Sequence, residues 1–254
     1  MQKFLKKTIK EAGNIAVEYF RQGVAHRIKA NLGDLVTDAD IAVSNFLISK
    51  IHEEFPDHGI HTEEEGDDIN PGAQYEWVID PIDGTRNFAM GISFWCVMVA
   101  VLKDKELYIS AIYNPLADEL FFAEKGSGAF MNGEQIFVNK VDSLDHGFGV
   151  AIRADNTQKE EEFKKVLSKL NTDTDAWLHA FGTMLPACHL ANGGIDFFVN
   201  NSGFDHDYLA AALICREAGA IVTDSDGNEW TRYRRDILIA NPNLHPKLLE
   251  LFSL

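Results

Sequence analysis

The sequence predicts a layered α/β protein in which helices cover the faces of β-sheets. Two observations predict this class. Up to about residue 145, two amphipathic segments are followed by apolar, strand-like runs that short turns separate. After about residue 145, strand-like and helix-like segments alternate along the chain. The chain has 254 residues, 46% of them apolar, which is enough to bury a substantial core.

The first half is expected to begin with two helices. Apolar residues recur at helical spacing over residues 4–20, which predicts the first. The second is expected over about 38–54, because "TDAD" from Thr37 to Asp40 has the pattern of a capping box and Pro56 follows the segment. Four apolar runs then predict strands of an antiparallel or meandering sheet: "WVI" at 77–79, "FWCVMVAVL" at 94–102, "LYISAIY" at 107–113 and "ELFFA" at 119–123.

The second half is expected to alternate between the two kinds of element. Strands are predicted for the short apolar runs at 147–152, 176–180, 195–199, 220–222 and 236–240. Helices are predicted over 157–170, 183–192, 207–218 and 244–252. We therefore expect one unit over 1–254, with an α+β half over about 1–145 and an α/β half over about 146–254.

Charge and composition exclude several partners. The formal net charge of −16 repels nucleic-acid phosphates, so no nucleic-acid partner is expected. No apolar run approaches the roughly 18 residues that cross a bilayer, and no signal-peptide pattern opens the chain, so a cytoplasmic protein without a membrane partner is expected. Three scattered cysteines suggest reduced core thiols. The basic cluster "TRYRRD" at 231–236 is interpreted as a solvated edge.

The stretch "EWVIDPIDGTRNF" at 76–88 ends a buried strand in two acids, Asp80 and Asp83. Two charges about 4 Å apart repel by roughly 4 kcal/mol near a protein surface, so these acids need compensation. Mg²⁺ would supply it through carboxylate oxygens, and the Ile82 carbonyl could be a further ligand. Gly84 permits close approach of a ligand, and a helix starting at Thr85 would offer an anion site. A strand followed by an Asp-Gly turn is the alternative.

Further acids could join this site. "HTEEEG" brings Glu63 to Glu65 shortly before the motif, and "GFDHDYLAAALICREAG" puts Asp205 and Asp207 at a helix start. Acids at helix starts are also common as caps, which is the structural explanation for Asp207 and for Asp40. His58 and His61 could bind zinc, but no cysteine lies nearby, so two surface histidines are favoured.

In these motifs the sequence resembles the inositol monophosphatase family, which comprises Mg²⁺-dependent, lithium-sensitive phosphatases of sugar and polyol phosphates. The resemblance covers nearly the whole chain. The segments that carry it are "DLVTDAD" at 34–40, "EEEG" at 63–66, "DPIDGTRNF" at 80–88, "AIYNPLADELFFAEKGSGAFMNG" at 111–133 and "DYLAAALICREAG" at 207–219.

The resemblance implies an αβαβα layered sandwich, usually a homodimer, with two or three Mg²⁺ ions and a small phosphate ester as substrate. The residues that it implies as metal ligands are Glu63, Asp80, the Ile82 carbonyl, Asp83 and Asp207. Those implied in water activation are Glu63, Asp40 and Thr85. Those implied in substrate binding are Asp83, Gly84, Thr85, Asn200 and Asp207. Glu64 would support a weaker metal position, and Lys29 falls where the family often has a basic residue.

The chain also departs from the family pattern. Thr62 replaces the usual glycine before the two glutamates, and His206 replaces a tryptophan, either as a packed ring or as a substrate contact. Asn200 stands where inositol-hydrolysing members often carry glutamate, which puts inositol specificity in doubt. Fructose-1,6-bisphosphatase or histidinol-phosphatase activity is therefore an alternative. The non-enzyme alternative is a cation-binding regulatory protein that kept the fold.

Overall fold

The N-terminal helices form where the sequence predicts them. The computed structural model describes residues 1–23, 26–28, 35–64, 68–153 and 159–252, with the backbone alone for 26–28, 35 and 36. The first two helices are α1 (Gln2–Gln22) and α2 (Asp38–Glu54). Asp40 N donates to Thr37 Oγ1 at 3.3 Å, and Thr37 N donates to Asp40 Oδ2 at 2.7 Å. The predicted capping box is therefore present at the start of α2.

A seven-stranded sheet follows, in the order β3-β4-β5-β6-β7-β8-β9. All neighbours pair antiparallel except β3 and β4, which are parallel, so the predicted meander is confirmed and gains one parallel edge strand. Its strands are β3 (Gly59–Thr62), β4 (Tyr75–Asp83), β5 (Cys96–Lys103), β6 (Glu106–Asn114), β7 (Glu119–Glu124), β8 (Gly128–Met131) and β9 (Glu134–Ile136). The short helix α3 (Thr85–Ala89) lies between β4 and β5, and a separate pair is formed by β1 (His26–Ile28) and β2 (Leu35–Thr37).

The second sheet has the order β11-β10-β12-β14-β13. Its first three strands are parallel, and β14 runs antiparallel to both of its neighbours. The strands are β10 (Phe148–Ile152), β11 (Trp177–His179), β12 (Phe197–Asn200), β13 (Ile221–Thr223) and β14 (Ile237–Ala240). The helices of this half are α4 (Glu160–Thr172), α5 (Leu185–Ala191), α6 (Asp205–Glu217) and α7 (His245–Phe252). The alternation is as predicted, although α6 begins at Asp205 rather than at residue 207.

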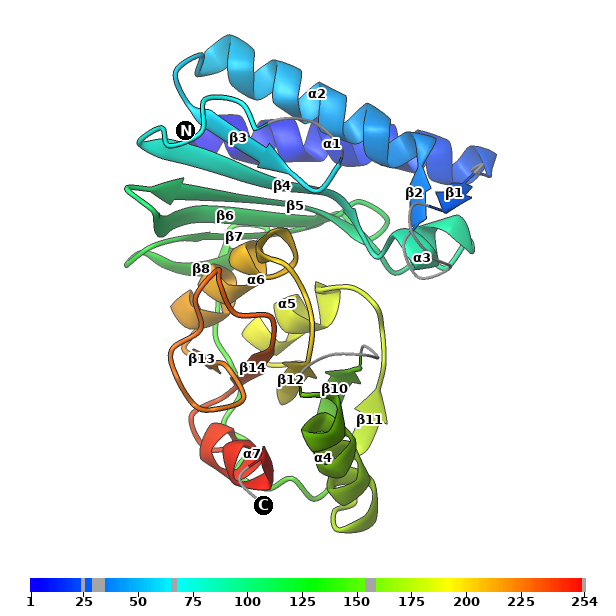
Figure 1. Ribbon diagram of the computed structural model, residues 1–254, viewed down its shortest axis with the longest axis vertical. Helices are drawn as coiled ribbons and strands as arrows, with labels where there is room; N and C mark the ends of the chain where they lie inside the picture. The colour runs from blue at the N-terminus through cyan, green and yellow to red at the C-terminus, as the bar shows by residue number, and fades with distance from the viewer. Residues whose placement is uncertain (24–25, 29–34, 65–67, 154–158, 253–254) are drawn as a thin grey trace.

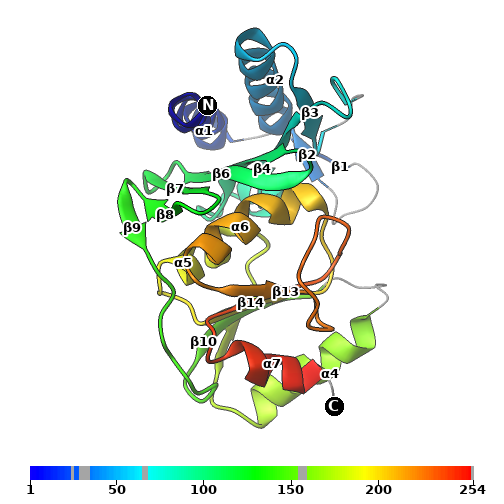
Figure 2. The same ribbon diagram turned by 90° about the vertical axis from the view of Figure 1, so that its left-hand side faces the viewer.

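The elements stack in five layers, which confirms the αβαβα sandwich (Figures 1 and 2). Helices α1 and α2 cover one face of the seven-stranded sheet, and α6 packs with α5 on its other face. The five-stranded sheet comes next, and α4 and α7 close the far side. Three apolar clusters fill the spaces between the layers, and the largest joins β5, α6 and β14. The N-terminus of α6 is thereby held beside the end of β4 where the acids lie.

The cysteines and the apolar character of the helices were both considered in the sequence. All three cysteines are free and buried, which confirms the prediction of reduced core thiols. In the described ranges, no helix combines the length and the apolar character that a membrane span requires.

The basic cluster at 231–236 is a solvated edge at Thr231, Tyr233, Arg234 and Arg235, which are exposed, but not at Arg232 and Asp236, which are partly buried. The side chain of Arg232 is only 18% exposed and makes a two-pronged contact with Glu76, at 2.8 and 2.9 Å. Its Nε also donates to Asp205 Oδ2 at 3.0 Å. The guanidinium of Arg235 lies 3.7 Å from the ring centre of Phe204. These contacts tie the segment after β13 to β4 and to the start of α6, and they join residues 156 and 27 positions apart.

Replacing Arg232 with methionine should lower the free energy of unfolding by about 2 kcal/mol, because two mostly buried carboxylates lose their partner. Urea denaturation measures this change. The variant Arg232→Lys keeps the charge but loses the planar fork, so it should recover only part of the loss. Arg21→Met, at an exposed position of α1, is the matched control. A change below about 0.5 kcal/mol for Arg232→Met would mean that the contacts behave as ordinary surface pairs.

Candidate active site

A bulge in β4 brings Asp80 and Asp83 to the same face of the sheet. On a regular strand, residues three apart point to opposite faces. Here Asp80 pairs with Met98 and Asp83 pairs with Cys96, so two residues of β4 oppose one of β5. Met98 and Cys96 both lie in the cluster beneath α6, and their cross-strand partners face the same way. Both carboxylates therefore point toward the layer that holds the N-terminus of α6.

Glu63 and Asp207 join the two acids from other elements. Glu63 follows β3, and its backbone N donates to Ile79 O at 3.1 Å, which continues the parallel pairing up to the level of Asp80. Asp207 sits in the first turn of α6, where Phe204 N donates to its Oδ2 at 2.5 Å. The negative charges of Glu63, Asp83 and Asp207 all act on Asp80. Three separate segments thus bring their acids to the end of β4.

Asp80 is the most constrained of these acids. It is 2% exposed, and its Oδ1 accepts no hydrogen bond from any described residue. Burial raises the pKa of Asp80 well above its usual value, and the charges of Glu63, Asp83 and Asp207 raise it further. A buried carboxylate oxygen without a partner is costly, so the site favours a bound cation or a proton. The donor set, all oxygen, is the kind that Mg²⁺ prefers.

Asp83 is oriented by a segment far away in the sequence. Its Oδ2 accepts hydrogen bonds from Thr183 Oγ1 at 2.5 Å and from Met184 N at 2.5 Å, and it lies 3.2 Å from Cys96 Sγ. Burial nevertheless raises the pKa of Asp83 to about 6, against these hydrogen bonds. Because Oδ2 is used in this way, Oδ1 is the oxygen left to face the other acids. Thr183 is a positioning residue that the sequence analysis missed, since 100 positions separate it from Asp83.

A second group of contacts links Asp40 to Thr85. The hydroxyl of Thr85 donates to Ile82 O at 2.9 Å and lies 3.4 Å from Asp40 Oδ1. Asp40 is fully buried, and burial raises its pKa to about 6 although Thr37 donates two hydrogen bonds to it. A carboxyl with a pKa near neutral pH beside a hydroxyl group can exchange a proton with it or with water held there. Asp40 thus serves both the helix cap and this site.

Gly84 allows the chain to turn from β4 into α3. It adopts φ of 90°, a conformation that L side chains rarely take. A Cβ there would also lie 3.2 Å from Gly182 O and 3.3 Å from Phe94 O. The predicted helical start at Thr85 is therefore present, and the close approach of a ligand at Gly84 stays a prediction.

The carboxylates lie near one another, but their oxygen atoms are not close enough to coordinate one ion together. Within the described ranges, only His61, Asp205 and His206 bring three ligand atoms within 4.8 Å of one another. Glu63, Asp80, Asp83 and Asp207, the predicted magnesium ligands, do not form such a group among the described residues. Like charges repel at short range, so these side chains are expected to draw together only when a cation lies between them.

Four further residues were singled out by the sequence. Glu64 is close enough for its charge to raise the pKa of Asp40. Asn200 ends β12, and its side chain accepts a hydrogen bond from Ser202 N at 3.0 Å in the segment leading to α6. The ring of His206 is 12% exposed and stacks on Phe204, with 5.3 Å between ring centres, which favours packing. Lys29 lies outside the described residues.

His58 and His61 are both partly buried, so they are only in part the surface histidines that the sequence favoured. The ring of His58 stacks on Phe55 and on Tyr75 and accepts a hydrogen bond from Trp77 Nε1 at 3.0 Å. His61 faces Asp68 at 2.8 Å. Phe55 and Asp68 are close in the sequence to the histidines that they contact, whereas Tyr75 and Trp77 reach His58 from β4.

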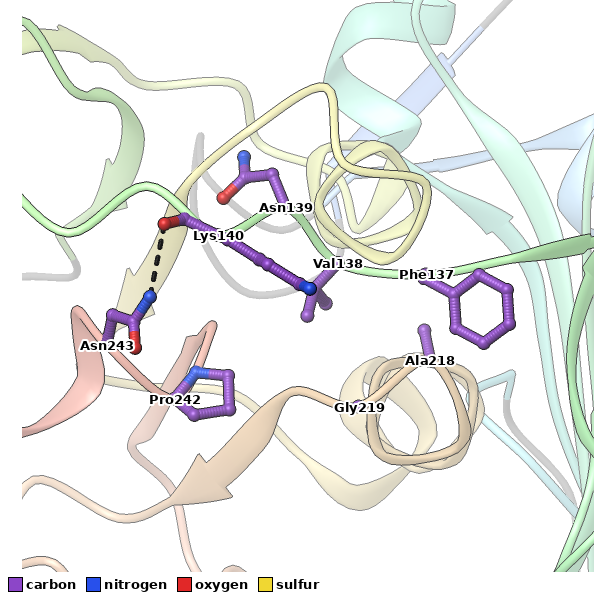
Figure 3. A pocket seen from close by; sticks show the side chains of 8 residues that line it. All are labelled: Phe137, Val138, Asn139, Lys140, Ala218, Gly219, Pro242 and Asn243. Atoms are coloured by element: carbon purple, nitrogen blue, oxygen red, sulfur yellow. Dashed lines mark hydrogen bonds between the residues drawn. The ribbon is translucent and has the colours of Figure 1, made fainter.

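A pocket of about 580 Å³ lies elsewhere and plays no part in this site (Figure 3). It is lined by Phe137, Val138, Asn139, Lys140, Ala218, Gly219, Pro242 and Asn243. The pocket adjoins the C-terminal end of α6, whereas the acids adjoin its N-terminal end, about 18 Å away along the helix. Asn243 Nδ2 donates to Lys140 O across one side of it, and its lining contains no carboxylate.

Comparison with known proteins decides the family. A family model described as "Inositol monophosphatase family" matches residues 1–253. The chain belongs to the inositol monophosphatase family. An inositol monophosphatase from Dictyostelium discoideum is 35% identical over 223 residues, which cover 86% of this chain and 82% of the relative. This family consists of phosphoric monoester hydrolases, and the chain is accordingly an enzyme of that class.

Two further relatives extend the comparison over the full length. A Thermotoga maritima protein named fructose-1,6-bisphosphatase/inositol-1-monophosphatase is 28% identical over 98% of this chain and 94% of its own. The crystal structure of the extragenic suppressor protein suhB from Bartonella henselae superimposes with a TM-score of 0.92 at 27% identity, covering 99% of this chain and 98% of that one. The fold is therefore that of the family from end to end.

Proposed function

We propose that this member of the inositol monophosphatase family is a Mg²⁺-dependent phosphatase that hydrolyses a polyol or sugar phosphate monoester. The observation that carries the proposal is the buried Asp80, whose Oδ1 has no hydrogen-bond partner among the described residues while three other acids surround it. Such an arrangement is costly unless a cation compensates the charge. Membership of the family supports a phosphatase in particular.

In this proposal Asp80 lies between two Mg²⁺ positions. Glu63, Asp80 and the Ile82 carbonyl would hold one ion, and Asp80, Asp83 and Asp207 would hold the other. The contacts of Asp83 support this role, because Thr183 and Met184 occupy one of its oxygens and leave the other for a metal. When bound, a pair of Mg²⁺ ions supplies stabilisation of the charge that develops on the attacking and leaving oxygens. Glu64 could support a third, weaker position.

The chain's own residues would orient the water and the phosphate. The Thr85 hydroxyl, fixed by its hydrogen bond to Ile82 O, would position the attacking water. Asp40, whose pKa is raised to about 6, would accept a proton through Thr85 when it is ionised. The backbone amides of Gly84 and Thr85 would hold the phosphate at the turn that the positive φ of Gly84 makes between β4 and α3. Asn200 would contact the hydroxyl groups of the substrate.

The residue at position 200 bears on the choice of substrate. Asn200, in place of the glutamate of many inositol-hydrolysing members, favours testing sugar phosphates alongside inositol phosphate. The name of the Thermotoga maritima relative supports fructose-1,6-bisphosphatase activity as the second candidate. A phosphate-release screen over inositol-1-phosphate, fructose-1,6-bisphosphate, histidinol phosphate and adenosine-3′,5′-bisphosphate tests both. Equal or faster release from fructose-1,6-bisphosphate would favour the second candidate.

The non-enzyme alternative, a cation-binding regulatory protein, is disfavoured by membership of a family of phosphoric monoester hydrolases. The paired Asp40 and Thr85 argue against it, because holding a cation does not require a hydroxyl group beside a carboxyl of raised pKa. Absence of phosphate release from every ester in the screen, at saturating Mg²⁺, would favour this alternative.

We also propose that residues 1–254 act as one unit whose halves meet at about residue 145. The largest apolar cluster supports this, because it draws Met98 from one half and Phe198 from the other. The buried free cysteines support a reducing, cytoplasmic location. A homodimer is proposed from the family resemblance, and light scattering of the purified protein tests it.

Replacing Thr183 with valine should raise the Mg²⁺ concentration that gives half-maximal activity by about 10–100-fold. Valine keeps the shape of threonine but removes the hydroxyl that donates to Asp83 Oδ2. Titration of activity against Mg²⁺ measures the effect. Thr183→Ser retains the hydroxyl and should stay close to wild type. Equal Mg²⁺ dependence of all three proteins would show that Thr183 does not position Asp83 for a metal.

A further inference from the structure

A cluster of two histidines and one aspartate lies beside the proposed magnesium site, and nothing in the phosphatase mechanism uses it. His61 comes from β3, and Asp205 and His206 come from the first turn of α6. One ligand atom from each lies within 4.8 Å of the other two. We propose that His61, Asp205 and His206 form a separate binding site for a divalent transition-metal ion of the Zn²⁺ class.

His61 is oriented as a metal ligand would be. Its Nδ1 lies 2.8 Å from Asp68 Oδ1, and a carboxylate can only accept, so Nδ1 carries the hydrogen. The other ring nitrogen, Nε2, then faces Asp205 Oδ1 at 3.7 Å. A carboxylate that fixes one nitrogen of a ligating histidine, and so presents the other to the ion, is the usual arrangement at metal sites. A cation between Nε2 and Oδ1 would satisfy both atoms.

Hydrogen bonds also fix the orientation of the Asp205 carboxylate. Its Oδ2 is held by Arg232, and its Oδ1 accepts from His206 N at 3.0 Å while facing His61. The charges around the cluster also favour a cation. The carboxylates of Asp68, Asp205 and Glu76 outnumber the guanidinium of Arg232, which the last two share.

The ring of His206 packs on one aromatic neighbour and lies near His61. It stacks on Phe204 with an interplanar angle of 9°, and its centre lies 6.3 Å from that of His61. It is 12% exposed, so the cluster lies at a partly buried junction between β3 and α6 rather than on an open surface. A cation bound here would be partly shielded from solvent.

The donor atoms decide the class of ion. Two imidazole nitrogens and one carboxylate oxygen suit Zn²⁺, Ni²⁺ or Co²⁺, whereas Mg²⁺ prefers oxygen alone. Ligand atoms around a tetrahedral Zn²⁺ lie about 3.3 Å apart, given bonds of about 2.0–2.1 Å. The separation of 3.7 Å between His61 Nε2 and Asp205 Oδ1 is already near this value. Three protein ligands would leave one position for water or for a substrate oxygen.

Binding of Co²⁺ to the full-length protein tests the proposal. Co²⁺ can also enter an oxygen-ligand site, so the measurement uses the Asp80→Asn variant in a buffer with excess Mg²⁺. Equilibrium dialysis gives the amount bound, and the visible absorption of Co²⁺ reports imidazole ligation. We expect Asp80→Asn to bind Co²⁺, and we expect addition of either His61→Gln or His206→Gln to abolish the binding and the absorption. His52→Gln, at an exposed position of α2, is the matched control and should retain both.

A second variant keeps the test decisive if a histidine substitution impairs folding. The side chain of Asp68 is 52% exposed, so Asp68→Asn should fold normally, and it should weaken Co²⁺ binding by about 10–100-fold. Failure of Asp80→Asn to bind Co²⁺, or binding that is the same with and without His61 and Asp68, would overturn the proposal and leave His61 as a histidine that pairs with two carboxylates. Since the readout is binding rather than turnover, its result is independent of the phosphatase proposal.

Discussion

Replacing Asp80 with asparagine is expected to reduce phosphate release to less than about one tenth of the wild-type rate at saturating Mg²⁺, a loss of at least about 1.4 kcal/mol in transition-state stabilisation. Asp80 is the acid on which the charges of Glu63, Asp83 and Asp207 converge, and in the proposed mechanism it contacts both metal positions. Asparagine has nearly the same shape but carries no charge, so added Mg²⁺ should not restore the rate. Single-turnover and steady-state phosphate release measure the effect.

The same substitution is expected to stabilise the metal-free protein. A buried carboxylate oxygen without a partner is replaced by a neutral amide, which removes an uncompensated charge from the interior. Lower activity combined with a higher melting temperature in EDTA would separate a lost function from a damaged fold. Asp145→Asn, on an exposed loop, is the matched control and should change neither quantity. More than a tenth of wild-type activity in Asp80→Asn would contradict the proposal that Asp80 is an essential metal ligand.

In the metal-free protein, the site should make the free energy of unfolding fall as the pH rises from about 4 to about 6. The folded-state pKa values of Asp40 and Asp83 are raised from 3.8 to about 6. The folded state therefore binds protons more tightly than the unfolded state between these values, so raising the pH favours unfolding. One such carboxyl contributes about 3 kcal/mol to this change. The pKa of Asp80 is also raised, so Asp80 acts in the same direction.

Added Mg²⁺ should reverse this loss and therefore stabilise the protein much more at pH 8 than at pH 5. At pH 5 protons compete for the same carboxylates, whereas at pH 8 the ion meets them already ionised. A concentration of about 100 times the dissociation constant would add about 2.7 kcal/mol. Thermal denaturation in EDTA and in Mg²⁺ at several pH values measures the difference. Asp83→Asn should flatten both the pH dependence and the response to Mg²⁺. An equal response at pH 5 and pH 8 would contradict a site built from these acids.

Much of the site could be predicted because its residues lie in short, recognisable sequence motifs. The acids of "DPIDGT" follow a recognisable buried strand, and "TDAD" has a capping pattern that is present at the start of α2. The positions of helices and strands also followed the periodicity of apolar residues, because each element buries one face. By contrast, the partial burial of His58, His61 and Arg232 was not predicted, since Trp77, Asp205 and Glu76 reach them from other elements of the fold.

What the sequence determined by itself was the αβαβα class, the family and the set of acids, because hydrophobic periodicity and short motifs are local properties of the chain. Only the tertiary structure decided how those acids are presented. The register of β4 on β5 shifts between Asp80 and Asp83, which forms the bulge. Thr183, 100 positions away in the sequence, orients Asp83. The meeting of His61 with His206 likewise depends on the first turn of α6 lying near His61 of β3. Such contacts between distant segments arise from packing, which no local pattern of residues specifies.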